Sequence, residues 1–418
     1  MAEIKATIIT IGDELLIGQT VDTNAVWIGQ ELNRIGVWVN RRVTITDEAD
    51  AILNTLSVES ENADIILITG GLGPTDDDIT KTTLCQYFES EMILNKAVLK
   101  HVEERVKQSG STLLQRNKNQ AMVPTNCRVL FNERGTAPGL WFEKEDTVYV
   151  AMPGIPYEMK GLMMQRVIPE ISERFSLPAI LHRTQLVSGI PESVLAKQLE
   201  GFEQSLPAHI HLAYLPINGF LKLRLTAKGQ IVQRIAHELD QYGMALENKV
   251  RDFLVAKKDI SLQELLGEKL RKQNLRVATA ESCTGGYIGH LITSVSGSSD
   301  YFEGAAVTYN NRLKQRWLNV PEKILMVHGA VSEEVVTAML QGVLGYLNTD
   351  VGIAVSGIMG PGGGSEEKPV GTVWMAAGAI GNIRTRKLQL RYNRLKNIEL
   401  TANYALLLLL EYLKDIDK

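Results

Sequence analysis

The chain has 418 residues, of which 44% are hydrophobic and 22% are charged, and its 44 basic and 48 acidic side chains give a net charge of −4. This length predicts two or three domains, since a typical domain holds about 150 residues. The charge balance argues against a generic nucleic-acid binder, and three scattered cysteines without a Cys-x-x-Cys pair argue against a disulfide framework or a structural zinc site.

The N-terminal segment passes from one short apolar run directly to acidic residues, unlike an export signal. We therefore expect a cytoplasmic protein. The apolar run at 406–410 is far shorter than the roughly 20 residues that cross a bilayer, so we expect it in a buried helix and expect no membrane partner.

Strand and helix patterns alternate through the first part of the chain. Apolar residues recur at three- and four-residue steps over 23–35, which predicts a helix capped by Asp22 or Thr23. A second helix is predicted over 48–61. Strands are predicted at 6–11, 38–43, 65–69 and 148–152. Such alternation is typical of a parallel sheet with helices on its faces.

The pattern changes near residue 170. Helices are predicted there over 192–204 and 230–249, among strands at 181–188, 209–215 and 220–227, which is typical of a small α+β module. A second α/β domain follows, with a helix over 261–273 and strands at 275–280, 305–309, 350–355 and 371–377. The predicted fold class is α/β, with two parallel-sheet domains (1–169 and 256–418) joined by an α+β module at 170–255.

Acidic residues and glycines follow two predicted strands of the first domain. Asp13 and Glu14 come after the first strand, and residues 70–80 hold a glycine-rich turn and three aspartates at 76–78. The ends of parallel strands open on one crevice, where such sheets bind ligands. Oxygen-rich surroundings favour a hard cation such as Mg²⁺ or Mn²⁺, which neutralises a pyrophosphate. The alternative is that the aspartates cap the next helix.

A serine stands between a strand and a helix of the last domain, in the run ESCTGG at 281–286. The first N–H groups of a helix lack intrahelical partners and favour anions. Ser282 is therefore positioned to attack a carbonyl whose developing oxyanion the backbone stabilises. The alternative is an N-cap serine, and Cys283 is a rival nucleophile.

A nucleophilic serine needs a base, and His290, His328 and Lys314 are the candidates. A lysine acts as a base only if burial or a neighbouring cation lowers its pKa. The alternative for Lys314 is a solvated surface position. Tyr309 could donate a proton, or could simply pack at the end of its strand.

A glycine-rich loop, SGIMGPGGGS at 356–365, follows the strand at 350–355. Its glycines let the backbone approach a ligand closely, as a phosphate cradle requires. The loop matches neither the dinucleotide fingerprint nor the P-loop pattern.

The motifs ATAESCTGG, GAAVTYNNRLK, HGAVSEE and SGIMGPGGGSEEKPVGTVW, within 275–377, resemble those of the CinA C-terminal domain, the family of nicotinamide mononucleotide amidohydrolases. The resemblance implies that a serine attacks the carboxamide, releasing ammonia and leaving nicotinic acid mononucleotide, without a cofactor. Matched by motif, Ser282 is the nucleophile, Lys314 its base and Tyr309 a supporting proton donor. The residues expected to bind this substrate are Thr284, Gly285, Gly286, Ser356, Gly357, Gly362, Gly363 and Arg394. In the tail, Tyr392-Asn393-Arg394 stands for the family's Gly-Asp-Arg, and Asn397-Ile398 replaces a basic pair.

The glycine-rich turn at 70–80, the run DTNAVWIGQELNRIG and the run MPGIPYEM resemble the N-terminal CinA domain, itself similar to molybdopterin-binding domains, over 5–165. The resemblance implies hydrolysis of ADP-ribose to AMP and ribose 5-phosphate with a divalent metal ion of the Mg, Mn or Co type. The expected metal ligands are Asp77, Asp78 and Glu158. The expected ADP-ribose contacts are Asp13, Glu14, Asn24, Gly70, Gly71, Gly73, Pro74, Thr75, Thr80 and Gly154.

The resemblance also implies a KH-like middle module and a homodimer. KH domains clamp nucleic acid with a Gly-x-x-Gly loop, which residues 170–250 lack, so we expect no nucleic-acid partner. Three function classes stay open. They are a bifunctional pyridine-nucleotide recycling enzyme acting on nicotinamide mononucleotide and ADP-ribose, a molybdopterin-type cofactor-binding module, and a regulatory competence or DNA-damage protein with degenerate sites. The intact set of Ser282, Tyr309 and Lys314 favours the enzyme.

Overall fold

The computed structural model describes residues 4–75, 77–108, 110 and 112–416. The chain divides into two compact units. One unit comprises Met1–His182, Leu206–His211 and Thr226–Tyr242, and the other comprises Arg183–Ser205, Leu212–Leu225 and Gly243–Lys418.

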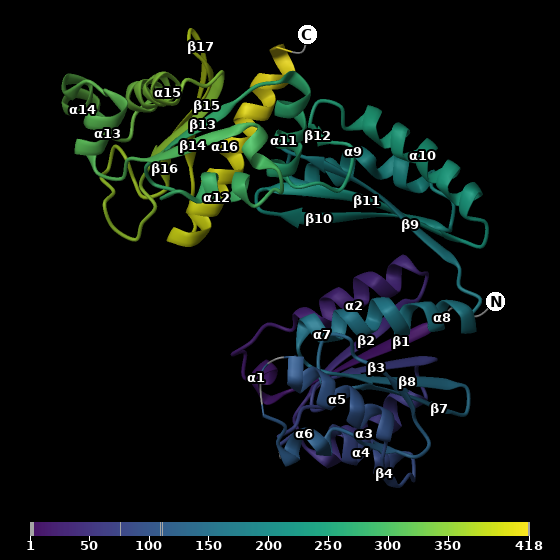
Figure 1. Cartoon of the computed structure of the whole chain (residues 1–418). Coiled ribbons are helices and arrows are strands. Elements are labelled where there is room, and N and C mark those ends of the chain that lie inside the picture. The colour runs from purple at the N-terminus through teal and green to yellow at the C-terminus, as the bar shows by residue number, and fades with distance from the viewer. Residues whose placement is uncertain (1–3, 76, 109, 111, 417–418) are drawn as a thin grey trace. The chain divides into compact units, whose positions relative to one another are not determined.

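The first sheet has six strands in the order β2-β1-β3-β8-β7-β6 (Figure 1). The first four are parallel, as predicted, and β7 and β6 extend the sheet with antiparallel pairing that the sequence patterns did not predict. The strands are β1 (Lys5–Ile11), β2 (Trp38–Ile45), β3 (Ile65–Thr69), β6 (Arg128–Leu130), β7 (Gly139–Lys144) and β8 (Thr147–Met152), with a separate ribbon of β4 (Met92–Leu94) and β5 (Met122–Pro124).

Helices cover both faces of this sheet. They are α1 (Asp13–Leu16), α2 (Thr23–Arg34), α3 (Ala49–Ser60), α4 (Thr80–Tyr87), α5 (Lys96–Gln108), α6 (Gln115–Asn119), α7 (Pro156–Leu162), a π-helical turn (Met163–Val167) and α8 (Ile168–Arg174). Side chains alternate along a strand, so Ile8 packs with α2 and α7 on one face, while Ile9 packs with α3 and α4 on the other. Asp22, whose carboxylate accepts from the N–H of Ala25, caps α2.

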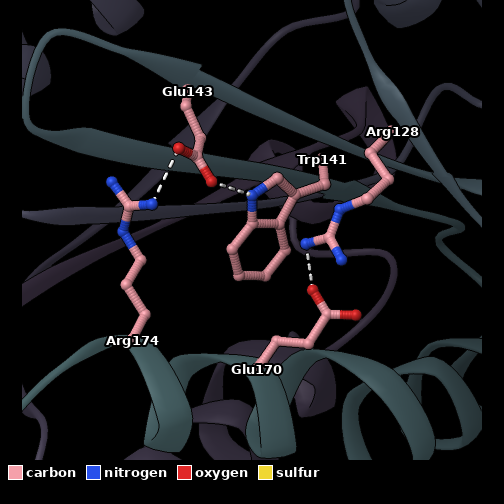
Figure 2. Close-up of polar contacts among 5 residues, drawn as sticks. All are labelled: Arg128, Trp141, Glu143, Glu170 and Arg174. Atoms are coloured by element: carbon pink, nitrogen blue, oxygen red, sulfur yellow. Dashed lines mark hydrogen bonds and ion pairs between the residues drawn. The ribbon is translucent and has the colours of Figure 1, made fainter.

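The antiparallel edge is tied to α8 by ion pairs (Figure 2). Arg174 donates to Glu143 at 2.7 Å, and the Trp141 indole N–H donates to the other oxygen of Glu143 at 3.0 Å. The Trp141 bond first, and then the Arg174 bond, hold the pKa of Glu143 below its usual value. Arg128 lies over the Trp141 ring and pairs with Glu170. These contacts fix the edge strands against the helix.

A four-stranded sheet in the order β10-β11-β9-β12 forms the middle of the chain. Its elements are β9 (Ala179–Val187), α9 (Glu192–Gln204), β10 (Ile210–Ile217), β11 (Phe220–Gly229), α10 (Val232–Lys249) and β12 (Leu254–Ala256). The elements match the predicted α+β module to within a few residues, and β12 was not predicted.

The last sheet has five strands in the order β14-β13-β15-β16-β17 (Figure 1). The first three are parallel, as predicted, and β16 and β17 are antiparallel. The strands are β13 (Val277–Glu281), β14 (Phe302–Val307), β15 (Val351–Gly357), β16 (Thr372–Ala379) and β17 (Asn382–Gln389). The helices are α11 (Leu262–Gln273), α12 (Tyr287–Thr293), α13 (Asn311–Leu318), α14 (Glu322–His328), α15 (Glu333–Leu347) and α16 (Arg394–Ile416), with a 3₁₀ turn at Ser298–Asp300.

The two faces of this sheet carry side chains of different size. Val351, Ile353 and Val355 of β15 pack with α11, α12 and α16, whereas small residues such as Ala280 and Ala354 allow α15 to pack closely on the other face. The leucines at 406–410 are buried in α16, as predicted. Within the described residues, no helix combines the length and apolar character that a membrane span requires.

Candidate functional site

The turn over residues 282–286, called here the nucleophile turn, connects β13 to α12. The main-chain N–H of Ser282 donates to the carbonyl of Val355 on β15 at 3.1 Å, and the N–H of Gly285 donates to the Ser282 carbonyl at 3.2 Å. Gly285 and Gly286 have φ values of 64° and 100°, in the left-handed region that favours glycine. The chain therefore reverses directly after Ser282 and holds this serine, 8% exposed, beside the end of the neighbouring strand.

The Lys314 side chain of α13 contacts the nucleophile turn. Its Nζ lies 3.0 Å from Ser282 Oγ, 2.8 Å from the Thr308 carbonyl oxygen and 3.4 Å from the Tyr309 carbonyl oxygen. Lys314 is 1% exposed, and this burial lowers its pKa from 10.5 to about 8. Within the described part of the chain, no carboxylate pairs with the amine. Lys314 therefore has the low pKa that a lysine base needs.

The buried face of α13 is the one that carries the lysine. Lys314 and Leu318 are buried one turn apart, whereas Trp317 is 43% exposed. The Asn310 side chain caps this helix by accepting from the N–H of Arg312. The alternative that Lys314 is a solvated surface residue is wrong.

The rival groups are less suited to catalysis than Ser282 and Lys314. Burial raises the pKa of the Cys283 thiol to about 12, so the reactive thiolate is scarce at neutral pH. His290 is exposed on α12, and His328 pairs with Glu334 at 3.1 Å. Neither histidine lines the cavity above Ser282.

A cavity of about 270 Å³ opens above Ser282 and Lys314. Most of the residues predicted for this site line it, namely Ser282, Tyr309, Lys314, Ser356, Gly357, Gly362, Gly363 and Arg394. Cys283, the rival nucleophile, also lines it, and the lining residues that were not predicted are Asn311, Ala330, Val331, Ile358, Met359 and Gly360. Groups from five separate segments of the last domain thus meet at one opening.

Three predicted substrate contacts lie outside this lining. Thr284 donates its hydroxyl to Glu281 at 2.6 Å, and the N–H of Gly286 donates to the same carboxylate at 3.1 Å. Gly285 donates back to Ser282. These groups are engaged within the protein, so the expected anion site at the start of α12 is already filled by the Glu281 carboxylate.

Tyr309 and Arg394 meet at the mouth of the cavity. The Arg394 guanidinium donates to the Tyr309 hydroxyl at 2.9 Å and to the Gly360 carbonyl at 2.9 Å. Tyr309 is 59% exposed, and its carbonyl rather than its hydroxyl contacts Lys314. The guanidinium thus sits beside the glycine-rich loop.

Two polar residues hold the walls of the cavity. The hydroxyl of Ser356 donates to the Ala330 carbonyl at 2.7 Å. Asn397, fully buried on α16, donates to the carbonyls of Met359 and Tyr392 and accepts from the N–H of Tyr392. Asn397 thereby joins the glycine-rich loop to the segment that leads into Arg394, a role that sequence reasoning missed. The signal available was a polar residue on the apolar face of α16.

The first domain brings its predicted residues to the carboxyl ends of β1, β3 and β8. Asn24 donates to the Thr69 hydroxyl at 3.2 Å and to the Gly154 carbonyl at 2.7 Å, which links α2 to the last residue of β3 and to the loop after β8. Within the described residues, the buried oxygens Asn24 Oδ1 and Thr80 Oγ1 have no hydrogen-bond partner. Buried polar atoms in proteins usually have a hydrogen-bond partner, so these two oxygens are available to a polar ligand or to water. The predicted contacts in the loops themselves are Asp13, Glu14, Gly70, Gly71, Gly73, Pro74, Thr75 and Gly154.

The predicted metal ligands do not gather at one point. Asp78 accepts from the N–H groups of Gly73 and Thr75, and thereby closes its own loop. Asp77 is exposed, and the hydroxyl of Thr75 first, then a backbone bond, lowers its pKa. Glu158 accepts from Asn132 at 2.6 Å, and burial raises its pKa. Asp76 lies outside the described residues.

A further acidic residue, Asp47, was not predicted. It follows β2 and accepts from the N–H of Asp13 at 3.2 Å. Burial first, and the nearby charges of Asp13, Glu14 and Asp77, raise its pKa. Among the residues the structure describes, no three or more His, Cys, Asp or Glu side chains are arranged to hold a metal ion. The expected ligand set of Asp77, Asp78 and Glu158 therefore does not fit a resident metal.

Comparison with known proteins gives two family matches. Residues 259–413 match the model of the CinA C-terminal domain, and residues 7–173 match that of a probable molybdopterin binding domain. A CinA-like protein of Cytophaga hutchinsonii is 44% identical over 99% of both chains, and one of Flavobacterium psychrophilum is 42% identical over 99% of this chain and all of its own. A putative competence-damage inducible protein of Halothermothrix orenii is 36% identical over 98% of both chains. Among solved structures, a competence/damage inducible protein of Agrobacterium tumefaciens is 36% identical, with a TM-score of 0.35 over 38% of this chain and 94% of its own.

Proposed function

The chain belongs to the CinA family, and on that premise we propose that its last domain hydrolyses the carboxamide of nicotinamide mononucleotide, releasing ammonia and leaving nicotinic acid mononucleotide. One observation carries this proposal: the buried amine of Lys314 lies 3.0 Å from the hydroxyl of Ser282 at the base of a cavity.

The surroundings of Lys314 suit a neutral amine. Such an amine has two N–H donors and one lone pair. The carbonyls of Thr308 and Tyr309 can accept both N–H groups, which leaves the lone pair facing Ser282 Oγ. With a pKa of about 8, a substantial fraction of the lysine is neutral near physiological pH. Lys314 is thus suited to take the serine proton.

In the proposed reaction, Ser282 Oγ attacks the carboxamide carbon while its proton passes to Lys314. The resulting tetrahedral intermediate collapses, the C–N bond breaks, and Lys314 returns the proton to the departing ammonia. Water then attacks the acyl-serine ester, with Lys314 again accepting a proton. The acid is released and the Ser282 hydroxyl is restored.

The rest of the cavity suits a charged nucleotide tail. Arg394 offers a guanidinium at the mouth, and guanidinium groups bind phosphate with paired hydrogen bonds. Gly362 has open space on its side-chain face, so a ligand can approach the backbone there. We assign the phosphate to this end and the carboxamide to Ser282.

The proposal is tested by incubating the purified protein with nicotinamide mononucleotide and measuring ammonia and nicotinic acid mononucleotide. Ser282→Ala is expected to reduce turnover by about 10³-fold or more. Cys283→Ala, at a buried thiol, serves as the matched variant and is expected to stay within about threefold of the wild type. Loss of activity in Cys283→Ala alone would reject Ser282 as the nucleophile.

For the first domain we propose binding and hydrolysis of ADP-ribose to AMP and ribose 5-phosphate. The unpartnered oxygens of Asn24 on α2 and Thr80 on α4, helices next to the ends of the parallel strands, support a polar ligand there. A divalent ion belongs to this proposal, although the carboxylates among the described residues do not form a site for it. AMP formation is measured across a panel of Mg²⁺, Mn²⁺ and Co²⁺. Tight molybdopterin binding without AMP would favour the cofactor-binding alternative.

A further inference from the structure

The residue before the nucleophile, Glu281, is a fully buried carboxylate. It ends β13, whose other residues are apolar or threonine, and it is 0% exposed. Burying a carboxylate without compensation is costly, so native structures surround such a group with donors or cations. The hydrogen-bond donors to Glu281 therefore indicate which part of the structure its carboxylate stabilises.

Five donors surround this carboxylate. Its Oε1 accepts from the Thr279 hydroxyl at 3.2 Å and from the N–H of Gly289 at 2.8 Å. Its Oε2 accepts from the Thr284 hydroxyl at 2.6 Å and from the N–H groups of Gly286 and Ile288 at 3.1 and 3.0 Å. None of these donors carries a formal charge, so the anion is stabilised by oriented dipoles at the start of α12.

Four of the five donors lie in the turn after Ser282 or the first residues of α12. We propose that Glu281 is the positioning residue of the nucleophile, which fixes the path of the nucleophile turn and hence the direction of Ser282 Oγ. The main-chain bond from Ser282 to Val355 anchors one side of the turn, and Glu281 anchors the other. The inference rests on the proposed amidase activity only in the choice of nicotinamide mononucleotide as the substrate of the test.

The direction in which the Glu281 carboxylate points also affects the protonation of Lys314, the proposed base. Glu281 and Lys314 both flank Ser282, but the oxygens of Glu281 bond to the α12 side, and Lys314 bonds to Ser282 and two carbonyls. An opposite charge in contact with Lys314 would favour its ammonium form. The Glu281 carboxylate thus stabilises the nucleophile turn without contacting the Lys314 amine.

The test compares Glu281→Gln, Glu281→Asp and a matched control, Glu59→Gln. Glu59 is a buried carboxylate of the first domain, 1% exposed, that accepts from Thr7 and pairs with Arg41. Turnover of nicotinamide mononucleotide gives kcat and KM. The rate at which phenylmethylsulfonyl fluoride modifies Ser282, followed by mass spectrometry, reports nucleophile alignment without that substrate.

Glu281→Gln keeps the size of the side chain but faces an amide NH₂ towards N–H donors. We expect kcat to fall on the order of 100-fold with KM within about threefold, and sulfonylation to slow in parallel, because misaligning a reacting group lowers the rate without removing substrate contacts. Glu281→Asp, which keeps the charge, recovers part of kcat. The pH midpoint of the rate stays that of the wild type, since Glu281 does not contact Lys314. Glu59→Gln leaves all these values unchanged.

Wild-type kcat and sulfonylation in folded Glu281→Gln would overturn the proposal, as would a change confined to KM. If that variant does not fold, Thr284→Val decides, because it removes one donor to Glu281 and is expected to lower kcat about tenfold. An unchanged kcat in Thr284→Val then counts against positioning. If the wild type is sulfonylated at Ser282 but does not hydrolyse the nucleotide, the sulfonylation rate replaces kcat as the test of the positioning role. The proposed substrate then fails, while slower sulfonylation of Glu281→Gln still supports the positioning role.

Discussion

The two α/β domains both carry glycine-rich turns and ionisable side chains at the ends of parallel strands, but they engage those side chains differently. In the last domain, Lys314 has no carboxylate partner within the described residues and faces a hydroxyl across 3.0 Å. In the first, Asp78 and Glu158 accept hydrogen bonds from neighbouring loop residues. Similar strand-end motifs thus provide side chains that are available for chemistry only where neighbouring donors and acceptors leave them unengaged.

The largest effect is expected from Lys314→Met, which removes the amine and keeps most of the side-chain volume. We expect the amidase rate to fall on the order of 10³-fold, the scale of a lost general base. Lys323→Met, at an exposed lysine of α14, is the matched control and keeps full activity. Ammonia release measures both. Activity of Lys314→Met near the wild-type level would contradict the role of Lys314 as a base, and with it the proposed difference between the two domains.

A smaller effect is expected from Arg394→Ala. Losing a charged hydrogen-bond donor costs about 1.5–3 kcal/mol, so KM for nicotinamide mononucleotide should rise about 10- to 100-fold. The unphosphorylated nicotinamide riboside should show no such loss, because it lacks the group that Arg394 is proposed to bind. Arg391→Ala, at an exposed arginine nearby, serves as the control. An equal rise in KM for both substrates would indicate that Arg394 maintains the wall of the cavity and does not bind the phosphate.

The pH dependence of the rate tests the state of the lysine. Burial lowers the Lys314 pKa to about 8, and only the neutral form accepts the serine proton. The kcat/KM should therefore rise with pH through about 8 and fall about tenfold per pH unit on the acid side. Initial rates in overlapping buffers from about pH 6 to 10 give the profile. A flat profile across this range would contradict the lysine-base mechanism.

The smallest effect is expected in the first domain, from Asn24→Ala. Removing one neutral hydrogen-bonding group costs about 0.5–1.5 kcal/mol, so the Kd for ADP-ribose should rise about three- to tenfold. Calorimetry measures binding, and Asn62→Ala, at an exposed asparagine of the same domain, is the control. If the wild-type protein does not bind ADP-ribose, ADP-ribose is not the ligand of the unpartnered Asn24 oxygen.

Much of the fold is predictable because long periodic elements repeat the same pattern. The helix over 23–35 is found at Thr23–Arg34, and the strand over 65–69 is found at the same residues. Three-residue strands such as β4 and β6 are too short to show a period, and β17 mixes charged and apolar residues on an edge of the sheet. These elements need their partner strands to be recognised.

The candidate site is predictable in its components but not in its hydrogen bonds. The sequence places Ser282 and Lys314 after the adjacent strands β13 and β14, so their approach follows from the topology. Nothing in the spacing reveals that Glu281 takes up the free N–H groups of α12, or that the Tyr309 hydroxyl meets Arg394. Such choices depend on which donors come within reach after the chain has packed.

The contact between Ser282 and Lys314 is assembled within one continuous stretch, from β13 to the end of α13 at Leu318. A single short piece of the gene therefore encodes both residues of the proposed catalytic pair, and recombination outside that piece leaves their spacing in the sequence intact. Arg394 lies far downstream, at the start of α16. We expect changes at Arg394 to alter how the proposed substrate is held, while the spacing of Ser282 and Lys314 is kept.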